Sequence, residues 1–437
     1  MYVNAQVKAA LSGAWHRDSA EASLERWQEV SAREGWGDLT DKLPLLVSVF
    51  GASWYFTRYI FYLGRDVIPL IDSARSGRYD LQSVLSKLSG SDVGPDPEQQ
   101  LEHLRLLKNG VMLQILICYL CGDFIQRQAE QALTHLADAT LMRILEIFDL
   151  SRDSSHYRLA VLGMGRMAGY EMTFGSDLDL IFLYEDLSGD EGYGLSRKIR
   201  MLLRHLASAS SAGSLYEIDM RLRPHGTSGA LLTTVGSFLE HHTSEREIWE
   251  RQVMTRCRAM IDKDGLGAAT LEEISPFIYS TYDEASLRME ILNMRARVEQ
   301  EKGRENNRYN LKQGRGGLMD IDFISHFFQL RDGAAIPELR TGSTRKALEV
   351  LAACDLLAAE DVRELLAAYD FMKRMEAGIR LFDMKSISSI AMQAQANRPL
   401  AQALGYGDNT DGFMEKYYSV TDGVRHLFMK LVGELPK

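Results

Sequence analysis

Apolar residues recur at helical spacing through the first third of the chain. In residues 130–148, EQALTHLADATLMRILEIF, the apolar side chains on one stripe are Leu133, Leu136, Leu141, Ile144, Leu145 and Phe148. A stripe with this period is typical of a helix that buries one face against its neighbours. We therefore expect residues 1–150 to form an N-terminal helical region.

The period of the pattern changes between residues 151 and 278. Two short runs rich in strand-forming residues, HYRLAVLG at 156–163 and LDLIFLY at 178–184, are bounded by glycine and aspartate. An amphipathic segment at 194–210 follows them and predicts a helix. This zone is expected to be a separate α/β unit.

Residues 215–224, LYEIDMRLRP, alternate between apolar and polar positions until Pro224. Strict alternation predicts a strand whose two faces differ. Tyr216, Ile218, Met220 and Leu222 share one face, and the polar face carries Glu217, Asp219, Arg221 and Arg223. A polar strand face inside an α/β unit is a place where chemistry can occur.

Helical spacing returns from residue 279 to the end of the chain. In residues 361–382 the helical stripe consists of Val362, Leu365, Leu366, Tyr369, Met372, Ile379 and Phe382. The pattern predicts a C-terminal helical bundle over 279–437. The whole chain is therefore expected to be α+β and predominantly helical.

Composition narrows the classes of protein that remain. The chain has 437 residues, a formal net charge of −10 and 46% hydrophobic residues, which suffices for more than one core. The acidic excess argues against nucleic-acid binding.

No stretch approaches the ~20 uncharged apolar residues that cross a bilayer, so no membrane association is expected. Four cysteines are too few for a disulfide framework, and the Cys118–Cys121 pair lies in an apolar run that favours a buried structural role. These features predict a cytoplasmic protein.

Two aspartates stand at the head of the apolar run in GSDLDLIFLYE. On a strand, residues two positions apart point to the same side at a backbone separation of about 6–7 Å, so Asp177 and Asp179 present like charges together. A divalent cation removes this repulsion, and Mg²⁺ favours one or two carboxylates together with phosphate oxygens and water. The pair therefore predicts a magnesium site that also receives a nucleoside triphosphate.

Glycines precede the acidic pair in GMGRMAGYEMTFGSD. Gly165 follows the strand expected at 156–163, and Gly175 and Ser176 stand directly before Asp177. Glycine lets backbone N–H groups approach and surround phosphate oxygens. An acidic pair alone is a weak signal, whereas a glycine-rich turn followed by Gly-Ser-Asp-Leu-Asp is much more specific.

A third carboxylate, Asp219, lies on the polar face of the alternating strand. If that strand lies beside the first, the three acids converge and can hold two metal ions about 3.5–4 Å apart, one at the attacking oxygen and one at the leaving phosphate. The alternative is that Asp219 only pairs with Arg221 or Arg223 at the surface. These two arginines can stabilise a triphosphate or simply balance the acids.

Four segments resemble, in order, the signatures of glutamine synthetase adenylyltransferase, a family of the polymerase-β-like nucleotidyltransferase superfamily. They are GMGRMAGYEMTFGSDLDLIFLY, LYEIDMRLRPHGTSGALLTT, WERQVMTRCRAM and LKQGRGGLMDIDF, and the resemblance runs from about residue 45 to the C-terminus. It implies a nucleotidyltransferase palm with flanking helices, and an enzyme that regulates nitrogen assimilation by transferring AMP from ATP to a tyrosine of glutamine synthetase. A PII-type signalling protein is a further implied partner.

The resemblance also implies roles for individual residues. By motif position, Asp177 and Asp179 bind the metal ions and Asp219 completes the catalytic site. The residues implied at the nucleotide are Gly165, Gly175, Ser176, Arg221, Arg223 and Lys312. Arg256 and Arg258 are expected near phosphate, while Asp320 and Asp322 either cap a helix or contact the nucleotide or a domain interface.

Several features depart from the family pattern. Arg166 stands where lysine is usual, and Asp322 stands where glutamate is usual. Family members usually contain two nucleotidyltransferase halves with opposed activities, and this chain has room for one. LYEIDMRLRP and GGLMDIDF favour the adenylylating half, and WERQVMTRCRA favours the half that removes AMP by phosphorolysis. The removing activity and a regulatory module without turnover therefore stay open as alternatives.

Overall fold

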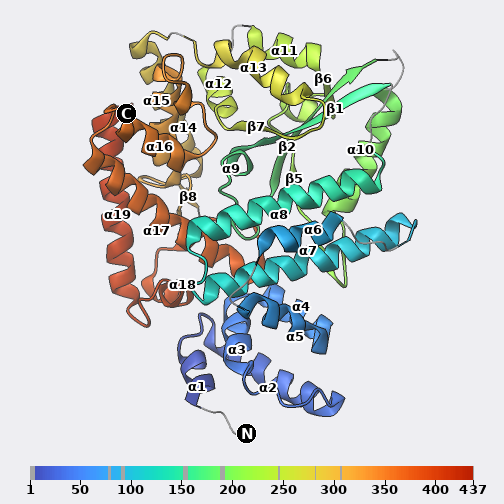
Figure 1. Ribbon diagram of the computed structural model, residues 1–437. Coiled ribbons are helices and arrows are strands. Elements are labelled where there is room, and N and C mark those ends of the chain that lie inside the picture. Colours follow the sequence, from blue (N-terminus) through green and yellow to red (C-terminus); the bar gives the residue numbers. More distant parts are fainter. Residues whose placement is uncertain are drawn as a thin grey trace.

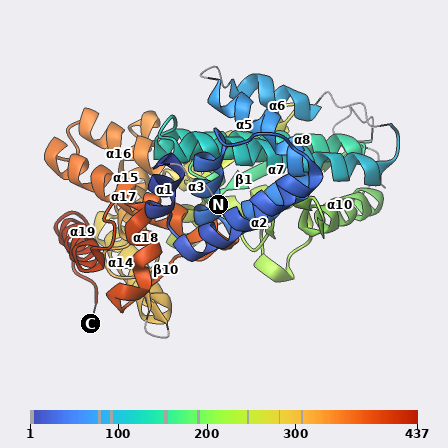
Figure 2. The same cartoon turned by 90° about the horizontal axis from the view of Figure 1, so that it is seen from below.

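The computed structural model describes residues 5–76, 80–89, 94–150, 156–187, 192–244, 247–280, 282–305 and 308–436. In Figures 1 and 2, helices α16–α19 lie at one end of the molecule and α10 at the other, with α8 running between them. The expected α+β, predominantly helical fold is confirmed. The boundary expected at residue 151 falls on residues 151–155, which lie outside the described residues.

The N-terminal part is helical. Its elements are α1 (Ala5–Ser12), α2 (Arg17–Glu34), α3 (Leu43–Ala52), α4 (Trp54–Leu63), the 3-10 turn η1 (Gly64–Asp66), α5 (Val67–Arg75), α6 (Leu81–Ser89), α7 (Pro97–Leu120) and α8 (Gln126–Ile147). The start of α7 is encoded locally, because Asp96 accepts a hydrogen bond from the amide of Glu98 and Pro97 occupies the first turn.

The middle of the chain supplies the central sheet and the helices beside it. Its strands are β1 (Tyr157–Met164), β2 (Leu178–Asp186), β3 (Ala209–Ser210), β4 (Gly213–Ser214), β5 (Ile218–Asp219), β6 (Leu232–Thr234) and β7 (Cys257–Asp262). Its helices are α9 (Gly165–Ala168), α10 (Gly192–Ala207), the 3-10 turn η2 (Gly226–Ser228), α11 (Val235–Thr243), α12 (Ile248–Met254) and α13 (Leu266–Ile278). The sheet order is β5-β2-β1-β7, and β6 also pairs with β2. β1 runs antiparallel to β2 and β7, whereas β5 and β6 run parallel to β2.

The C-terminal part returns to helices and adds a small sheet that the sequence pattern did not predict. Its elements are α14 (Glu284–Lys302), β8 (Arg304–Glu305), β9 (Arg308–Asn310), α15 (Leu318–Asp332), η3 (Pro337–Leu339), α16 (Thr344–Ala353), α17 (Ala359–Asp383), β10 (Ser389–Ala391), η4 (Ala394–Asn397), α18 (Arg398–Ala403) and α19 (Thr410–Leu431). The strands pair in the order β10-β9-β8.

Both faces of the central sheet are buried. Leu178, Leu180 and Phe182 belong to a core that also contains the inner faces of α7, α8 and α10. Ile181 and Leu183, on the opposite face, pack with α11, α13 and the C-terminal helices. Burying each such side chain contributes about 1.5–3 kcal/mol, so β2 is held from both sides. This fixed strand is the support for the acidic pair at its start.

Two expectations about local structure are wrong. The strand expected at 215–224 is reduced to the two residues of β5, because the chain turns at 221–225 and the guanidinium of Arg223 donates to the carbonyls of Met220, Thr227 and Gly229. The cysteine pair is also not buried as a unit, since Cys118 is buried on α7 whereas Cys121 is exposed just beyond its end.

Among the described residues, no helix combines the length and the apolar character needed to cross a bilayer.

Candidate active site

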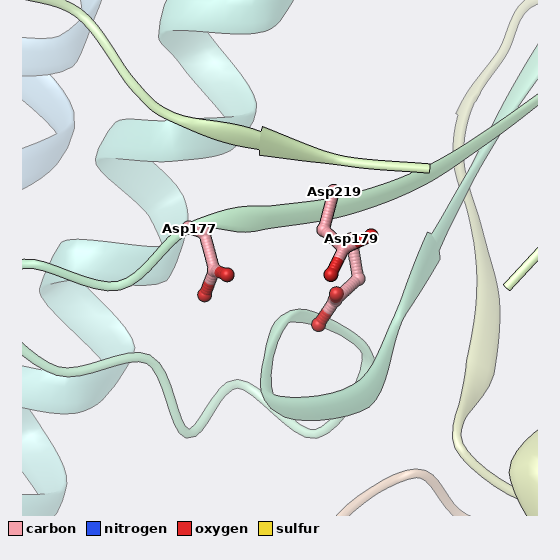
Figure 3. Close-up of side chains that lie close together, drawn as sticks. All are labelled: Asp177, Asp179 and Asp219. Atoms are coloured by element: carbon pink, nitrogen blue, oxygen red, sulfur yellow. The ribbon is translucent and has the colours of Figure 1, made fainter. Parts of the chain in front are cut away.

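Three aspartates meet at the edge of the central sheet. Asp177 precedes β2, Asp179 lies on β2, and Asp219 lies on β5. One carboxylate oxygen from each lies within 4.8 Å of the others. Figure 3 shows the three side chains directed toward a common space.

Strand register brings the third acid to the other two. β5 runs parallel to β2 with Asp219 beside Asp179, and the amide of Leu178 donates to the carbonyl of Glu217 at 2.9 Å. Neighbouring strands lie about 4.8 Å apart, so side chains that share a face are close. Two residues of strand are therefore enough to complete the cluster.

Gly165 makes room for Asp179. Its φ is +57°, which favours glycine, and a Cβ there would lie 3.0 Å from Oδ2 of Asp179. Its amide donates to the carbonyl of Arg256 at 2.9 Å, which fixes the turn between β1 and α9 against β7. Gly165 thus lies next to the carboxylate of Asp179.

The cluster carries more negative charge than its surroundings offset. Burial and the neighbouring charges of Asp177 and Asp219 raise the pKa of Asp179 to about 7, although Lys312 and Arg221 act in the opposite direction. In the absence of a cation, Asp179 would therefore be partly protonated near neutral pH.

Arg221 and Arg223 have different surroundings. Arg221 donates from its backbone amide at 2.8 Å and from its guanidinium to both oxygens of Asp219, and these hydrogen bonds lower the pKa of Asp219. Its side chain is 74% exposed, so it can leave this position easily. Arg223 instead donates to the three backbone carbonyls named above, so its guanidinium holds the turn after β5.

Gly175 and Ser176 line the turn before the acids. Gly175 has φ +64°, and a Cβ there would lie 2.9 Å from the carbonyl carbon of Met384, so the turn packs tightly against the end of α17. The hydroxyl of Ser176 accepts from the amide of Thr173 at 3.0 Å, and Arg380 approaches it at 3.5 Å. Both residues are placed next to Asp177, but these contacts belong to the turn itself.

Lys312 lies between two groups of charges. Its side chain is exposed, yet surrounding protein and the nearby Arg166 lower the pKa of its amine, while Glu376, Asp179 and Asp322 raise it. Lys312 therefore lies within electrostatic range of the three aspartates.

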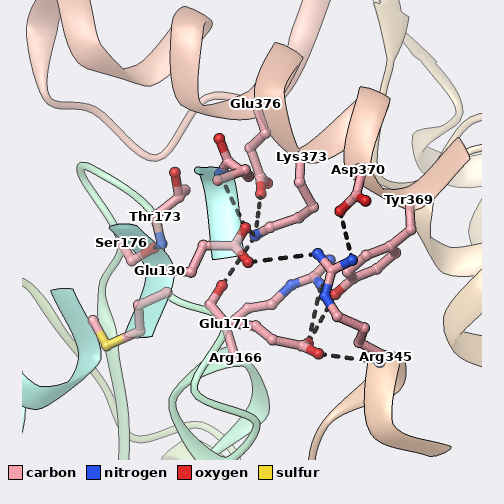
Figure 4. Close-up of polar contacts among 12 residues, drawn as sticks. Glu130, Arg166, Glu171, Thr173, Ser176, Arg345, Tyr369, Asp370, Lys373 and Glu376 are labelled. Carbon is pink, nitrogen blue, oxygen red and sulfur yellow. Dashed lines mark hydrogen bonds and ion pairs between the residues drawn. The ribbon is translucent and has the colours of Figure 1, made fainter. Parts of the chain in front are cut away.

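Behind the aspartates is a buried ionic cluster, defined here by Arg166, Glu171, Arg256, Asp322 and Tyr369. Arg256 contacts Glu171 at 2.6 Å and Asp322 at 3.1 Å, and Arg166 contacts Glu171 at 3.7 Å, Asp322 at 3.5 Å and the hydroxyl of Tyr369. Tyr369 donates to Glu171 at 2.8 Å. The cluster joins α9 and the loop after it to α15 and α17. Figure 4 shows Arg166 and Glu171 beside Tyr369 of α17.

A second set of buried charges extends this connection to α8 and α16. Lys373 lies 3.3 Å from Glu130 and 3.1 Å from Glu376, and it donates to the carbonyl of Glu171 at 3.0 Å. Arg345 pairs with Asp370 at 2.5 Å. Sequence reasoning missed Glu171, Tyr369 and Lys373, because their partners lie far away along the chain and nothing in the spacing indicates the contacts.

Four other charged residues for which the sequence suggested a site role have buried or ion-paired positions in the structure. They are Arg256, Arg258, Asp320 and Asp322. Arg256 is committed to the ionic cluster, and Arg258 pairs with Asp138 at 2.6 Å, so both already have carboxylate partners. Asp320 is fully buried between Arg295 at 2.5 Å and Arg425 at 2.8 Å, and it accepts from the amide of Gly316. Asp322 likewise faces arginines, so neither acid is a simple solvent-exposed cap.

The donor set suits a hard divalent cation. Three carboxylates that share one space provide only oxygen ligands, as Mg²⁺ and similar ions require. The raised pKa of Asp179 indicates that nearby positive charge is insufficient. Asp177, Asp179 and Asp219 are the residues that would hold such an ion.

Comparisons with known proteins agree with these features. A family model described as glutamate-ammonia ligase adenylyltransferase matches residues 45–273, and one described as GlnD PII-uridylyltransferase matches residues 292–432. A similar protein from Chromobacterium violaceum, a bifunctional glutamine synthetase adenylyltransferase/adenylyl-removing enzyme, is 32% identical over 299 residues. The match covers 67% of this chain and 33% of the relative, so the chain spans about one third of that relative's length.

Proposed function

The chain belongs to the glutamate-ammonia ligase adenylyltransferase family, and from this premise we propose that it transfers AMP from ATP to a tyrosine of glutamine synthetase. The observation that carries the proposal is the convergence of Asp177, Asp179 and Asp219 within 4.8 Å. The family match supports the reaction class, and the acids supply a site for it.

The proposed reaction is a displacement at phosphorus. The tyrosine oxygen forms a bond to the α-phosphorus of ATP, the bond from that phosphorus to the bridging oxygen of the β-phosphate breaks, and pyrophosphate leaves. The phenolic proton must be removed, because a tyrosine hydroxyl with a pKa near 10 is a poor nucleophile at neutral pH.

Residues of this chain would position the reactants and offset their charge. We assign the metal ions to Asp177, Asp179 and Asp219, and the triphosphate to the turn at Gly165 together with Lys312 and Arg221. Gly175 and Ser176 shape the adjoining turn, and Arg223 holds the loop that follows β5. When bound, a pair of Mg²⁺ ions would supply the positive charge that the acids and phosphates lack.

Radiolabelled ATP tests the proposal. Purified glutamine synthetase is incubated with the chain, Mg²⁺ and ATP labelled at the α-phosphate, and labelled protein is measured. We expect label on a tyrosine of glutamine synthetase with the native chain and at least about a hundredfold less with Asp177→Asn. Metal-dependent ATP binding without any labelled protein would instead support a regulatory module without turnover.

The same site could run the opposite reaction. The double name of the Chromobacterium violaceum relative favours this second candidate, in which phosphate attacks the phosphorus of tyrosine-bound AMP and releases ADP and the free hydroxyl. Incubation with AMP-modified glutamine synthetase and phosphate separates the two directions, since only adenylyl removal yields ADP.

A PII-type signalling protein is a further proposed partner. The match of residues 292–432 to a PII-uridylyltransferase family model supports it. Adding a purified PII-type protein to the labelling assay should change the rate of transfer. An unchanged rate, with no complex detected by size-exclusion chromatography, would remove this partner from the proposal.

A further inference from the structure

A groove lies between α2, α4 and the hairpin formed by β3 and β4. It has a volume of about 720 Å³, and residues of these three elements line it. Helices α2 and α4 belong to the N-terminal part of the chain and lie below α7 in Figure 1. The described residues that line the groove do not include Asp177, Asp179 or Asp219, so it is a surface separate from the three-aspartate site.

The outer face of α4 exposes large aromatic side chains along this groove. Trp54, Arg58 and Tyr62 follow one another at intervals of four residues, so they share one face of the helix. Trp54 is 44% exposed and Tyr62 is 46% exposed, whereas Phe56 and Ile60 on the opposite face are buried. Exposed aromatic side chains gathered on one face of a helix are typical of a binding surface.

The charge along the groove is positive. Arg26 and Arg58 are exposed and line it, and neither pairs with a carboxylate among the residues that the structure describes. The guanidinium of Arg26 lies 4.9 Å from the ring centre of Phe61, which positions it on the wall. No aspartate or glutamate is found among the described lining residues. On a chain with a net charge of −10, this is a local positive surface that attracts anionic groups.

The two walls of the groove are fixed to each other. The hydroxyl of Tyr55 donates to Oδ1 of Asn109 at 3.0 Å, and the amide of Asn109 donates to the carbonyl of Ala212 in the hairpin at 2.7 Å. Gly213 has φ +98°, and a Cβ there would lie 2.5 Å from the hydroxyl of Tyr55, so the hairpin packs directly against α4. A preformed surface binds a partner without the cost of ordering it.

We propose that this groove docks a short acidic segment of a partner protein, with its carboxylates on Arg26 and Arg58 and an aromatic side chain against Trp54 and Tyr62. Tryptophan, tyrosine and arginine are the residues that most often carry binding energy at protein interfaces. From Trp54 to Tyr62 the helix rises about 12 Å, which is the length of three or four residues of extended chain. A long nucleic acid fits less well, because the acidic chain around this small positive surface repels a polyanion.

Binding of a fluorescein-labelled peptide, Asp-Glu-Phe-Glu-Asp, tests the proposal. Its dissociation constant is measured by fluorescence anisotropy without ATP, so the result does not depend on AMP transfer. We expect Trp54→Ala to weaken binding at least about tenfold, whereas Trp249→Ala, at a tryptophan of α12 that is also 44% exposed, should leave it unchanged. Arg58→Gln should weaken binding and make it less sensitive to salt, and Arg65→Gln, at an exposed arginine outside the groove, should do neither.

A second readout detects weak binding and keeps the groove intact. The chain is labelled with 5-fluorotryptophan, and the ¹⁹F NMR signal of Trp54 is assigned through Trp54→Phe. The acidic peptide should shift this signal and leave that of Trp249 in place, whereas Lys-Lys-Phe-Lys-Lys should shift neither. An unmoved Trp54 signal, equal binding by Trp54→Ala and Trp249→Ala, equal binding of the lysine peptide, or tighter binding of single-stranded oligothymidine would each overturn the proposal.

Discussion

The three-aspartate site and the ionic cluster around Glu171 both gather carboxylates beside the central sheet, but only in the ionic cluster are the carboxylates balanced by an equal number of arginines. In the cluster, burial opposes ionisation, yet Arg166 and Arg256 hold the pKa of Asp322 well below its usual range. At the aspartate site, burial and like charge raise the pKa of Asp179 to about 7. The pKa of Asp322 and the pKa of Asp179 are thus shifted in opposite directions.

This difference in charge balance distinguishes carboxylates that stabilise the fold from carboxylates that bind a ligand. A buried group of charges that is balanced internally holds segments together, whereas an unbalanced group near the surface indicates a missing ligand. The ionic cluster holds α9 and the loop after it against α15 and α17. The amine of Lys312 interacts electrostatically with Asp179 of the aspartate site and with Arg166 and Asp322 of the ionic cluster.

Breaking the balanced cluster should have the largest effect. Arg256→Met leaves Glu171 and Asp322 buried with one arginine fewer, and breaking a buried pair costs about 3–5 kcal/mol of unfolding free energy. Urea unfolding followed by circular dichroism measures the loss. Arg17→Met, which removes an exposed ion pair with Glu21, is the matched control and should leave unfolding unchanged. Equal stability of the two variants would mean that the cluster does not hold the fold.

Removing one acid from the unbalanced site should instead affect activity. Asp177→Asn keeps the shape of the side chain but removes a charge from the proposed metal site. Loss of one positioned electrostatic contact at a transition state costs about 10²–10³ in rate, which α-labelled ATP measures as label transferred to glutamine synthetase. Circular dichroism of the same variant should match the native chain. Undiminished transfer would reject the assignment of Asp177.

Features that depend on residues close together in the sequence could be predicted from it. The helical character of both ends of the chain and the strands β1 and β2 followed from periodicity, and the acidic pair followed from spacing along one strand. The family signatures brought Asp219 to the same site. The ionic cluster could not be predicted, because Arg256 meets Glu171 and Asp322 from positions 85 and 66 residues away. The shortened β5 was also missed, since alternation in LYEIDMRLRP does not reveal that Arg223 holds a turn instead of a strand.

The pH dependence of the unfolding free energy should reveal the raised pKa of the aspartate site. The folded-state pKa of Asp179 is raised from 3.8 to about 7, so metal-free folded protein keeps a proton that the unfolded chain loses, and stability falls as pH rises through this window. The native chain should therefore lose on the order of 2–4 kcal/mol relative to Asp179→Asn between pH 4 and pH 8. Thermal unfolding in EDTA at several pH values gives the difference. Parallel curves for the two proteins would contradict the raised pKa.

The smallest effect is expected at Arg221. Its guanidinium covers both oxygens of Asp219 but is 74% exposed, and exposed ion pairs are worth about 0.2–1 kcal/mol. Arg221→Gln should therefore tighten Mn²⁺ binding to the nucleotide-free chain by up to about fivefold, because the cation no longer competes with the arginine. Weaker Mn²⁺ binding in this variant would show that Arg221 assists the ion rather than competing with it.

A titration of the nucleotide-free chain with Mn²⁺ at pH 7, monitored by calorimetry in two buffers of different ionisation enthalpy, tests most directly whether the three aspartates need a cation. A bound ion requires ionised carboxylates, so binding should release a proton from the protein molecules in which Asp179 is protonated, and it should weaken as the pH falls below 7. Asp179→Asn should abolish the proton release. Binding of the same strength and proton stoichiometry in a chain with all three aspartates replaced by asparagine would contradict the account.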